Sequence, residues 1–347
     1  PRFREIPIAV VPGSEQRHPV VSENWIAWQD DRATPIVHGV RAEDRATGTE
    51  FWVSPMPNRG VYHSRPQLSG DLILWQGNPN ATGTLFYDDL SNSNPQRLYT
   101  QSTHQFLGDI AGDLVVWHET TGNPLVEGNV YGTRLGSGVK FPISTTNRVH
   151  GLPRTDGRFV VWNEFLSSNI SQGSGIFMKD LETGASMQLY DRGTSPAIDD
   201  GVVAFAARGG VAIRNLLTGQ NMLLPTANIV QDGSVAISKN IVVFSQYDSP
   251  LGSPFNLDLW GANIHTGEQF LISGGPGNQY WPDIHGSMVV WNDDRNGDLD
   301  VYAAMIPEPA AFSLAAIGLI VLFGRRGRGL VAEARCCSRA SLGHAHI

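Results

Sequence analysis

Short apolar runs that end in Trp or Phe recur along the chain roughly every 44 residues, a period typical of repeat architectures. The seven copies are residues 25–28, 72–75, 114–117, 159–162, 202–205, 241–244 and 288–291. Counting back from the terminal aromatic residue, Gly stands five positions before it in four copies, an aliphatic residue seven before in six, and Pro nine before in five. The repeated unit therefore predicts a short strand, a tight turn and an apolar strand.

Two further strands follow in each copy. A third is indicated by residues 85–87, 175–178 and 300–302, and a Thr-Gly turn such as Thr218-Gly219 then leads to a fourth, such as residues 269–272. Four strands in about 44 residues is the size of one propeller blade, and seven copies make one ring. The pattern predicts an all-β protein, a seven-bladed β-propeller of four-stranded antiparallel blades.

The two ends of the repeat region complement each other. The seventh copy stops after Tyr302 without a Thr-Gly turn or a fourth strand, whereas residues 3–10 look like a fourth strand that lacks its first three. The N-terminal strand is therefore expected to complete the last blade, so that no sheet edge stays open where the ring joins. Residues 1–305 are predicted to form the propeller.

The seventh copy also carries a recognisable motif. It reads Pro-x-Ile-x-Gly-x-x-Val-Val-Trp-Asn-Asp-Asp-Arg-Asn-Gly-Asp-Leu-Asp-Val-Tyr over residues 282–302, which resembles the TolB-like propeller repeats of bacterial and archaeal surface proteins. Blades five and six depart from the motif, because Phe205 and Phe244 replace Trp and no Asp-Asp-Arg follows them. Proteins of this family include binding and scaffold proteins and some enzymes, so the resemblance implies a fold and leaves the activity open.

The C-terminal segment has three parts in a fixed order: Pro-Glu-Pro, an apolar run over residues 310–323, and a basic cluster over residues 324–328. As a helix the run would be about 21 Å long, which is shorter than the ~30 Å hydrocarbon core of a membrane. The arginines are expected to stay on the cytoplasmic side and the propeller outside. An ordinary membrane anchor would show the same hydrophobic helix.

The order of the three parts resembles the PEP-CTERM sorting signal of Gram-negative bacteria. The resemblance implies recognition by an exosortase-type enzyme, cleavage near residues 307–309, and delivery to the outer surface or extracellular matrix. The sorting residues would be Pro307, Glu308, Pro309, Arg325 and Arg326. The signal would cover residues 306–328, and the basic tail of residues 329–347 goes beyond the family pattern, as an out-of-frame extension, a linker remnant or a cytoplasmic end discarded on cleavage.

Charge and cysteine content narrow the classes of partner. The chain carries a net charge of −8, and the basic tail leaves residues 1–309 with 20 basic and 32 acidic groups. An acidic body argues against nucleic acid as a partner, because phosphate binding needs a basic surface. Both cysteines, Cys336 and Cys337, lie in the tail, so the body is expected to contain no disulfide and no thiolate metal site.

Histidines stand before the terminal aromatic residue in the first four copies. They are His18, His63, His104 and His150. In a propeller, loops at this point would surround one mouth of the central channel, where His63, His104 and His150 could bind a divalent transition metal. Some seven-bladed polysaccharide lyases hold a metal with channel histidines, which makes a metal-dependent polysaccharide lyase or hydrolase the enzyme alternative. The other interpretation is solvated loop residues.

The tip of the last blade offers a second candidate metal site. Asp294, Asn296 and Asp298 alternate along the chain, and carboxylate and amide oxygens suit Ca²⁺. A polar β-turn with an Asp–Arg surface pair accounts for the same residues, both here, at Asp293-Asp294-Arg295, and at Asp30-Asp31-Arg32 of blade one. Nearby, Tyr280 and Trp281 could stack on sugar rings, although most propeller tryptophans fill space between blades.

The sequence contains no common catalytic signature: Gly-x-Ser-x-Gly, His-Glu-x-x-His, Gly-x-Gly-x-x-Gly and Cys-x-x-Cys are all missing. The leading hypothesis is an exported, non-catalytic binding or scaffold module of the cell envelope or matrix, whose partner is an exopolysaccharide or an envelope protein. The alternatives are the metal-dependent lyase or hydrolase and a purely structural protein.

Overall fold

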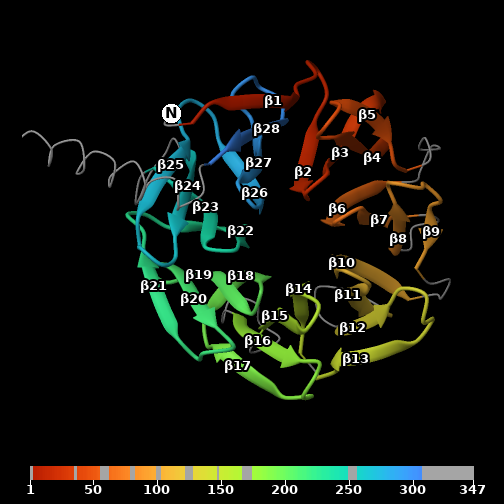
Figure 1. The fold of residues 1–347 in the computed structure, drawn as a ribbon, viewed down its shortest axis with the longest axis vertical. Coiled ribbons are helices and arrows are strands. Elements are labelled where there is room, and N and C mark those ends of the chain that lie inside the picture. Colours follow the sequence, from red (N-terminus) through yellow and green to blue (C-terminus); the bar gives the residue numbers. More distant parts are fainter. Residues whose placement is uncertain are drawn as a thin grey trace, which may run out of the picture. The chain divides into compact units, whose positions relative to one another are not determined.

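The computed structural model describes residues 3–34, 37–54, 62–78, 83–98, 103–121, 128–146, 148–165, 174–248 and 256–306. These residues form seven four-stranded antiparallel sheets arranged as blades around a ring (Figure 1). In each blade the first strand lies nearest the centre and the fourth lies outermost. The sequence-based prediction of a seven-bladed all-β propeller is confirmed. None of the described residues forms a helix that is long and apolar enough to cross a membrane.

The strands follow one order in every blade, from the centre outwards. Blades one to four are β2 (Gln16–Val21), β3 (Trp25–Thr34), β4 (Val37–Asp44), β5 (Thr49–Trp52); β6 (His63–Ser69), β7 (Leu72–Gly77), β8 (Thr84–Asp89), β9 (Gln96–Arg97); β10 (His104–Ala111), β11 (Leu114–Thr120), β12 (Asn129–Arg134), β13 (Lys140–Ser144); and β14 (His150–Thr155), β15 (Phe159–Phe165), β16 (Ser174–Asp180), β17 (Ser186–Tyr190). Blades five to seven are β18 (Gly193–Asp199), β19 (Val202–Ala207), β20 (Gly210–Asn215), β21 (Asn221–Pro225); β22 (Val230–Ser238), β23 (Ile241–Tyr247), β24 (Leu257–Asn263), β25 (Gln269–Ser273); and β26 (Gln279–His285), β27 (Met288–Asp293), β28 (Asp300–Met305), β1 (Glu5–Ala9).

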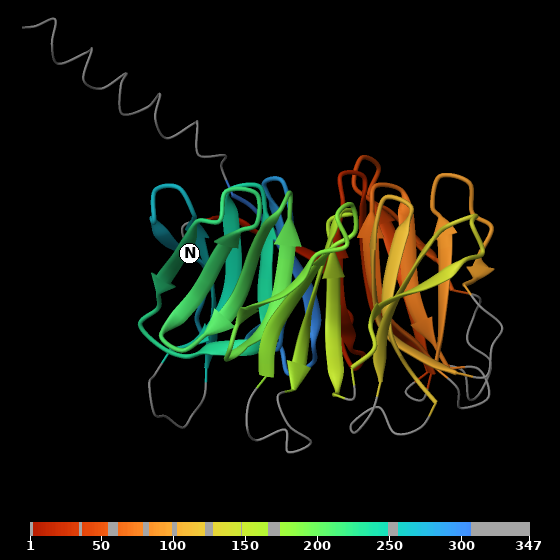
Figure 2. The ribbon, with the colours of Figure 1, turned by 90° about the horizontal axis from the view of Figure 1, so that it is seen from below.

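The ring closes as the chain ends predict. Strand β1 pairs antiparallel with β28, with Glu5 opposite Ala304, so the last blade takes its outer strand from the N-terminus. Each innermost strand also contacts the innermost strand of the next blade, including β2 with β26 across the closure. The strands run between the two faces of the ring (Figure 2).

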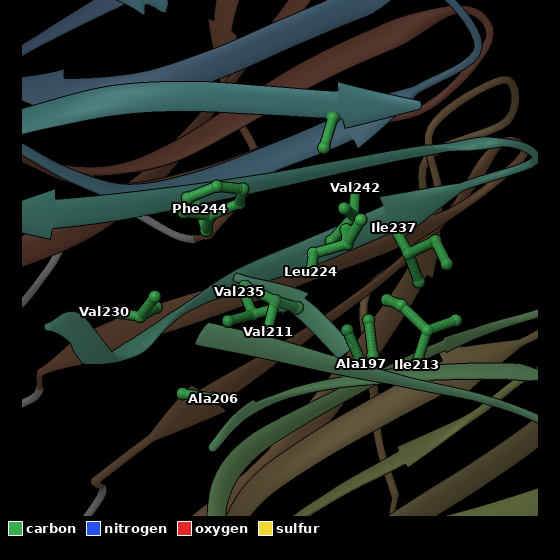
Figure 3. Close-up of a cluster of buried hydrophobic side chains, with 12 residues drawn as sticks. Ala197, Ala206, Val211, Ile213, Leu224, Val230, Val235, Ile237, Val242 and Phe244 are labelled. Carbon is green, nitrogen blue, oxygen red and sulfur yellow. The ribbon is translucent and has the colours of Figure 1, made fainter. Parts of the chain in front are cut away.

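The core consists of seven clusters of buried side chains, and every cluster combines residues of two neighbouring blades. Between blades five and six, for example, Val211, Ile213 and Leu224 pack against Val235, Val242 and Phe244 (Figure 3). The second strand of a blade is therefore buried on both faces, which explains its continuous apolar run. No described blade has a core of its own.

Three consecutive buried residues, beginning with the aromatic residue of the repeat, lie in the second strand of blades one and seven. In blade seven they are Trp291, Asn292 and Asp293, all fully buried. The indole Nε1 of Trp291 donates to Asp293 Oδ2 at 3.2 Å, and the Arg295 guanidinium pairs with the same carboxylate. Arg295 also pairs with Glu5 of β1 (Nη1 to Oε2, 2.6 Å).

Blade one repeats this arrangement with Trp28, Asp30, Arg32 and Glu50. The hypothesis of an Asp–Arg pair at the surface is therefore wrong for Asp30 and Asp293. Both carboxylates are fully buried beneath the arginine and accept an indole N–H.

We expect Asp293→Ala to lower the free energy of unfolding by about 3–5 kcal/mol, because it leaves the Arg295 charge and the Trp291 indole without their buried partner. Urea denaturation followed by tryptophan fluorescence measures the change.

The control is Glu182→Ala, which removes a surface carboxylate paired with Arg158, its side chain 65% exposed. It should change the stability by less than about 1 kcal/mol. An Asp293→Ala variant as stable as this control would contradict the role assigned to the buried carboxylate.

Candidate functional site

Every innermost strand is interrupted at the same position by a β-bulge. The pairing with the second strand shifts register there in all seven blades. The residue at each bulge has a positive φ, between 45° and 80°: His18, Arg65, Leu107, Leu152, Ser195, Gly233 and Trp281. In five blades the next residue is the Pro of the repeat, which cannot donate a hydrogen bond to the second strand. A bulge redirects the side chain it carries.

The preceding blade holds the bulge in place. The backbone N–H of His18 donates to Asn292 Oδ1 (2.8 Å), and that of Ser195 donates to Asn163 Oδ1 (3.2 Å). The same asparagines donate to carbonyl oxygens two residues earlier, Asn292 to Gln16 O (2.5 Å) and Asn163 to Gly193 O (3.0 Å). In these two cases the residue after the aromatic therefore fixes the bulge of the next blade.

Side chains of neighbouring bulges meet around the ring axis. The rings of His18 and Trp281 lie with their centroids 4.3 Å apart at 35°, although the two residues belong to blades one and seven. The N–H of Gly233 donates to the hydroxyl of Ser195, and Trp281 lies beside Gly233. Trp281 and His18 are only partly buried. Together they form an aromatic contact between the innermost strands of blades seven and one.

Two arginines also face the axis. Arg65 is the bulge residue of blade two, and Arg154 lies two residues after the bulge of blade four. The Arg65 side chain is exposed to solvent, yet the surrounding blades desolvate it, and this burial, with the charge of Arg154, lowers the pKa of Arg65. Arg65 and Arg154 therefore lie close enough for their charges to interact, although they belong to blades two and four.

Two carboxyl groups occupy the position of Arg154 in their own innermost strands, two residues after the bulge. Asp109 accepts the N–H of Thr155 (2.8 Å) and Asp283 accepts the N–H of Val21 (2.8 Å), each from the following blade. Burial raises the pKa of both, that of Asp283 to about 6, while the charge of Arg154 opposes the shift. Burial also lowers the pKa of His18 to about 3, assisted by Arg65 and Arg17, so His18 is neutral at physiological pH.

The histidines proposed for a transition metal lie in the innermost strands and not in loops. The Nδ1 of His63 accepts the Trp75 indole N–H at 3.1 Å, in the one blade where Gly77 replaces the usual acceptor residue. His104 Nδ1 lies 3.4 Å from the backbone N of Gly83. His150 bonds to Gly128 O (2.7 Å) and to the hydroxyl of Ser144 (2.9 Å). The three histidines belong to three different blades, and each has its own hydrogen-bond partners.

The residues proposed for Ca²⁺ also have separate partners. Asp294 accepts from the side-chain and backbone N of Asn278 (2.8 and 2.6 Å), Asn296 donates to Asp300 (2.8 Å), and Asp298 accepts the N–H of Gly13 (2.8 Å). Across the described residues, no three His, Cys, Asp or Glu side chains form a group that could hold a metal ion. The proposed sorting residues Pro307, Glu308, Pro309, Arg325 and Arg326 lie outside the described residues.

The sequence singled out Trp281 and His18 but not Arg65, Arg154, Asp109 or Asp283. The repeat contains a signal for these positions. The residue directly before the repeat's Pro occupies the bulge, as Arg65 does, and Arg154 and Asp283 stand two positions after the bulge residue. This spacing indicates a site only once the position of the bulge is known.

Comparisons with known proteins find likeness in fold alone. Neither a known protein family nor a curated protein matches the chain. Among solved structures, an oligogalacturonate lyase from Vibrio parahaemolyticus is 11% identical, with a TM-score of 0.67 over 88% of this chain and 94% of that one. An oligogalacturonate lyase in complex with manganese is 11% identical, with a TM-score of 0.63 over 88% and 98%. TolB from Acinetobacter baumannii is 18% identical, with a TM-score of 0.47 over 62% and 55%.

The raised pKa of Asp283 predicts how stability depends on pH. The folded protein holds this proton more tightly than the unfolded chain, whose aspartates titrate near 3.8, so stability falls as the pH rises from about 4 to about 6. Asp283→Asn keeps an acceptor for the Val21 N–H without the charge. We expect this variant to lose that part of the pH dependence and to be more stable than the wild type at pH 7 by ~1–3 kcal/mol.

Urea denaturation between pH 4 and 7 measures the effect. Asp113→Asn, at an exposed carboxylate, is the matched control and should stay within about 0.5 kcal/mol of the wild type. An Asp283→Asn variant whose stability follows the wild-type pH profile would show that the Asp283 carboxyl is not desolvated.

Proposed function

We propose that the chain is a non-catalytic binding module that holds a glycan at the axis of the propeller. The observation that carries the proposal is the contact between the tilted rings of Trp281 and His18, which are partly exposed and stand at the bulges of two innermost strands. A flat aromatic surface packs against the C–H face of a sugar ring, while polar groups beside it bind the hydroxyls. The innermost strands carry both kinds of group, the aromatic rings of Trp281 and His18 and polar groups such as Arg65 and Asp283.

The rigidity of the innermost strands supports the proposal. The bulge of His18 is held by Asn292, and Asp283 accepts the neighbouring Val21 N–H, so the aromatic pair is positioned by blade-to-blade hydrogen bonds. A binding surface built on strands and fixed by a second layer of hydrogen bonds loses little conformational entropy when a ligand binds. The site resembles a preformed ligand site more than a space-filling contact.

The metal-dependent polysaccharide lyase or hydrolase has less support. Two of the similar structures are oligogalacturonate lyases, one of them bound to manganese, but an 11% identity extends to this chain only the fold. Both His63 and His150 are buried; His63 is bonded to Trp75 of its own blade, and His150 is bonded to Gly128 O of blade three. Elemental analysis of the purified protein tests this alternative, since near-stoichiometric manganese or zinc would favour it over the binding module.

We further propose that the propeller is exported and sorted to the cell surface or matrix through residues 306–328. The proposal rests on the order of Pro-Glu-Pro, apolar run and arginine cluster. A glycan-binding module at that location would bind the exopolysaccharide of its own cell. An envelope protein as partner is the other outcome.

Replacing Trp281 by Ala tests glycan binding. We expect at least a tenfold loss of affinity for the purified exopolysaccharide of the producing cell, equivalent to about 1.4 kcal/mol, because the stacking surface is removed. Affinity electrophoresis in gels that contain the polymer measures the change.

Tyr190→Ala is the control, because Tyr190 is an exposed aromatic residue on the outermost strand β17 of blade four. It should bind as the wild type does. Equal retention of Trp281→Ala and wild type, or no retention of the wild type on any glycan tested, would overturn the proposal.

Sorting is tested in the producing cell by replacing Arg325, Arg326 and Arg328 with Gln. We expect the full-length chain to accumulate in the membrane fraction, whereas the wild type is recovered at the surface in a form shortened by its C-terminal segment. Mass spectrometry of the two forms locates the cleavage. Uncleaved wild-type protein that stays in the membrane would favour the ordinary anchor.

A further inference from the structure

Seven of the fifteen arginines in the described residues form ion pairs with carboxylates, and Arg65 is not among them. The arginines that form ion pairs with carboxylates are Arg17, Arg32, Arg41, Arg134, Arg148, Arg158 and Arg295. Within the described part of the chain, Arg65 has no carboxylate partner, and the charged group that acts on it is another guanidinium, that of Arg154. In a body with an excess of acidic residues, this positive charge at the axis remains uncompensated.

The charges around Arg65 do not neutralise it. Asp109 and Asp283 interact with Arg154, so the charge of Arg154 is partly balanced, and each carboxylate also holds a backbone N–H of the next blade. His18, in the adjacent blade, is neutral. The charge of Arg65 helps to lower the pKa of His18, so its guanidinium lies near the aromatic pair of Trp281 and His18.

Position links Arg65 to the stacking surface. Trp281, His18 and Arg65 are the bulge residues of blades seven, one and two, three consecutive blades of the ring. Equivalent positions on adjacent blades lie side by side around the axis, as the contact between Trp281 and His18 shows. A single sugar residue over Trp281 and His18 can thus direct a substituent toward Arg65.

We propose that the site selects saccharides that carry an anionic group, with Arg65 binding the anion while Trp281 and His18 pack against the sugar ring. This inference rests on the proposed glycan-binding function and names the class of glycan. The guanidinium presents a planar set of donors that matches a carboxylate or a sulfate in bidentate geometry. Its partly desolvated surroundings strengthen the attraction to an anion relative to bulk water.

The test compares one saccharide in charged and neutral form. Oligogalacturonate and its methyl ester differ in charge at the same position, and a sulfated oligosaccharide distinguishes the two anion types. Isothermal titration calorimetry with the full chain is expected to show at least tenfold tighter binding of one anionic form than of the neutral ester. Raising the salt concentration should reduce this preference, because an accessible ion pair is screened.

Arg65→Gln should abolish the preference and leave binding of the neutral ester within about twofold of the wild type. Arg158→Gln, at an exposed arginine that pairs with Asp180 and lies in the turn between β14 and β15, is the matched control and should keep the preference. Equal melting temperatures of the two variants exclude a loss of fold.

The outcomes separate the two proposals. If the wild type binds charged and neutral forms equally, or if Arg65→Gln keeps the preference, the selection of anionic saccharides is wrong while glycan binding stands. If the wild type binds none of these probes, the inference fails, and loss of exopolysaccharide retention would remove the proposed function as well.

Discussion

Burial of the second strand between two neighbouring blades is the constraint on which the rest of this structure depends. Because every apolar cluster is shared by two blades, a blade without neighbours would expose both faces of its sheet. The ring must therefore close, and it closes by adding the N-terminal strand β1 to the last blade. Arg295 strengthens the junction by pairing with both Asp293 and Glu5.

The candidate site lies at this closure. Trp281 belongs to the last blade and His18 to the first, so their contact exists only in the closed ring. The residues that position them also bridge the closure, since Asn292 and Asp283 of blade seven bind backbone groups of blade one. Loss of the closure would thus remove the site together with the stability of the ring.

Much of the architecture could be predicted because it follows from repeated residues. The spacing of the terminal aromatics indicated seven blades, and the missing fourth strand of the last copy indicated the closure. Side-chain roles were harder to predict. His63 was one candidate metal ligand because its position recurs, and the structure shows that it accepts the Trp75 indole N–H where Gly77 provides no acceptor side chain.

The axis-facing arginines were missed for a physical reason. In an ordinary strand, alternation decides which residues share a face, but a bulge adds one residue and reverses that pattern. The repeat's Pro marked the position of the bulge without revealing it, so Arg65 looked like any surface arginine in the sequence. The Asp-Asp-Arg motif was likewise assigned to the surface, because sequence alone does not show that Arg295 covers a fully buried Asp293.

The central claim is that the closed ring presents one ligand site, formed by Trp281, His18 and Arg65. A crystal structure of the chain with a bound acidic oligosaccharide tests it most directly. We expect a sugar ring against Trp281 and His18, with its anionic group within hydrogen-bond distance of the Arg65 guanidinium. A ligand bound only on the outer strands of the blades, with the axis unoccupied, would contradict the account.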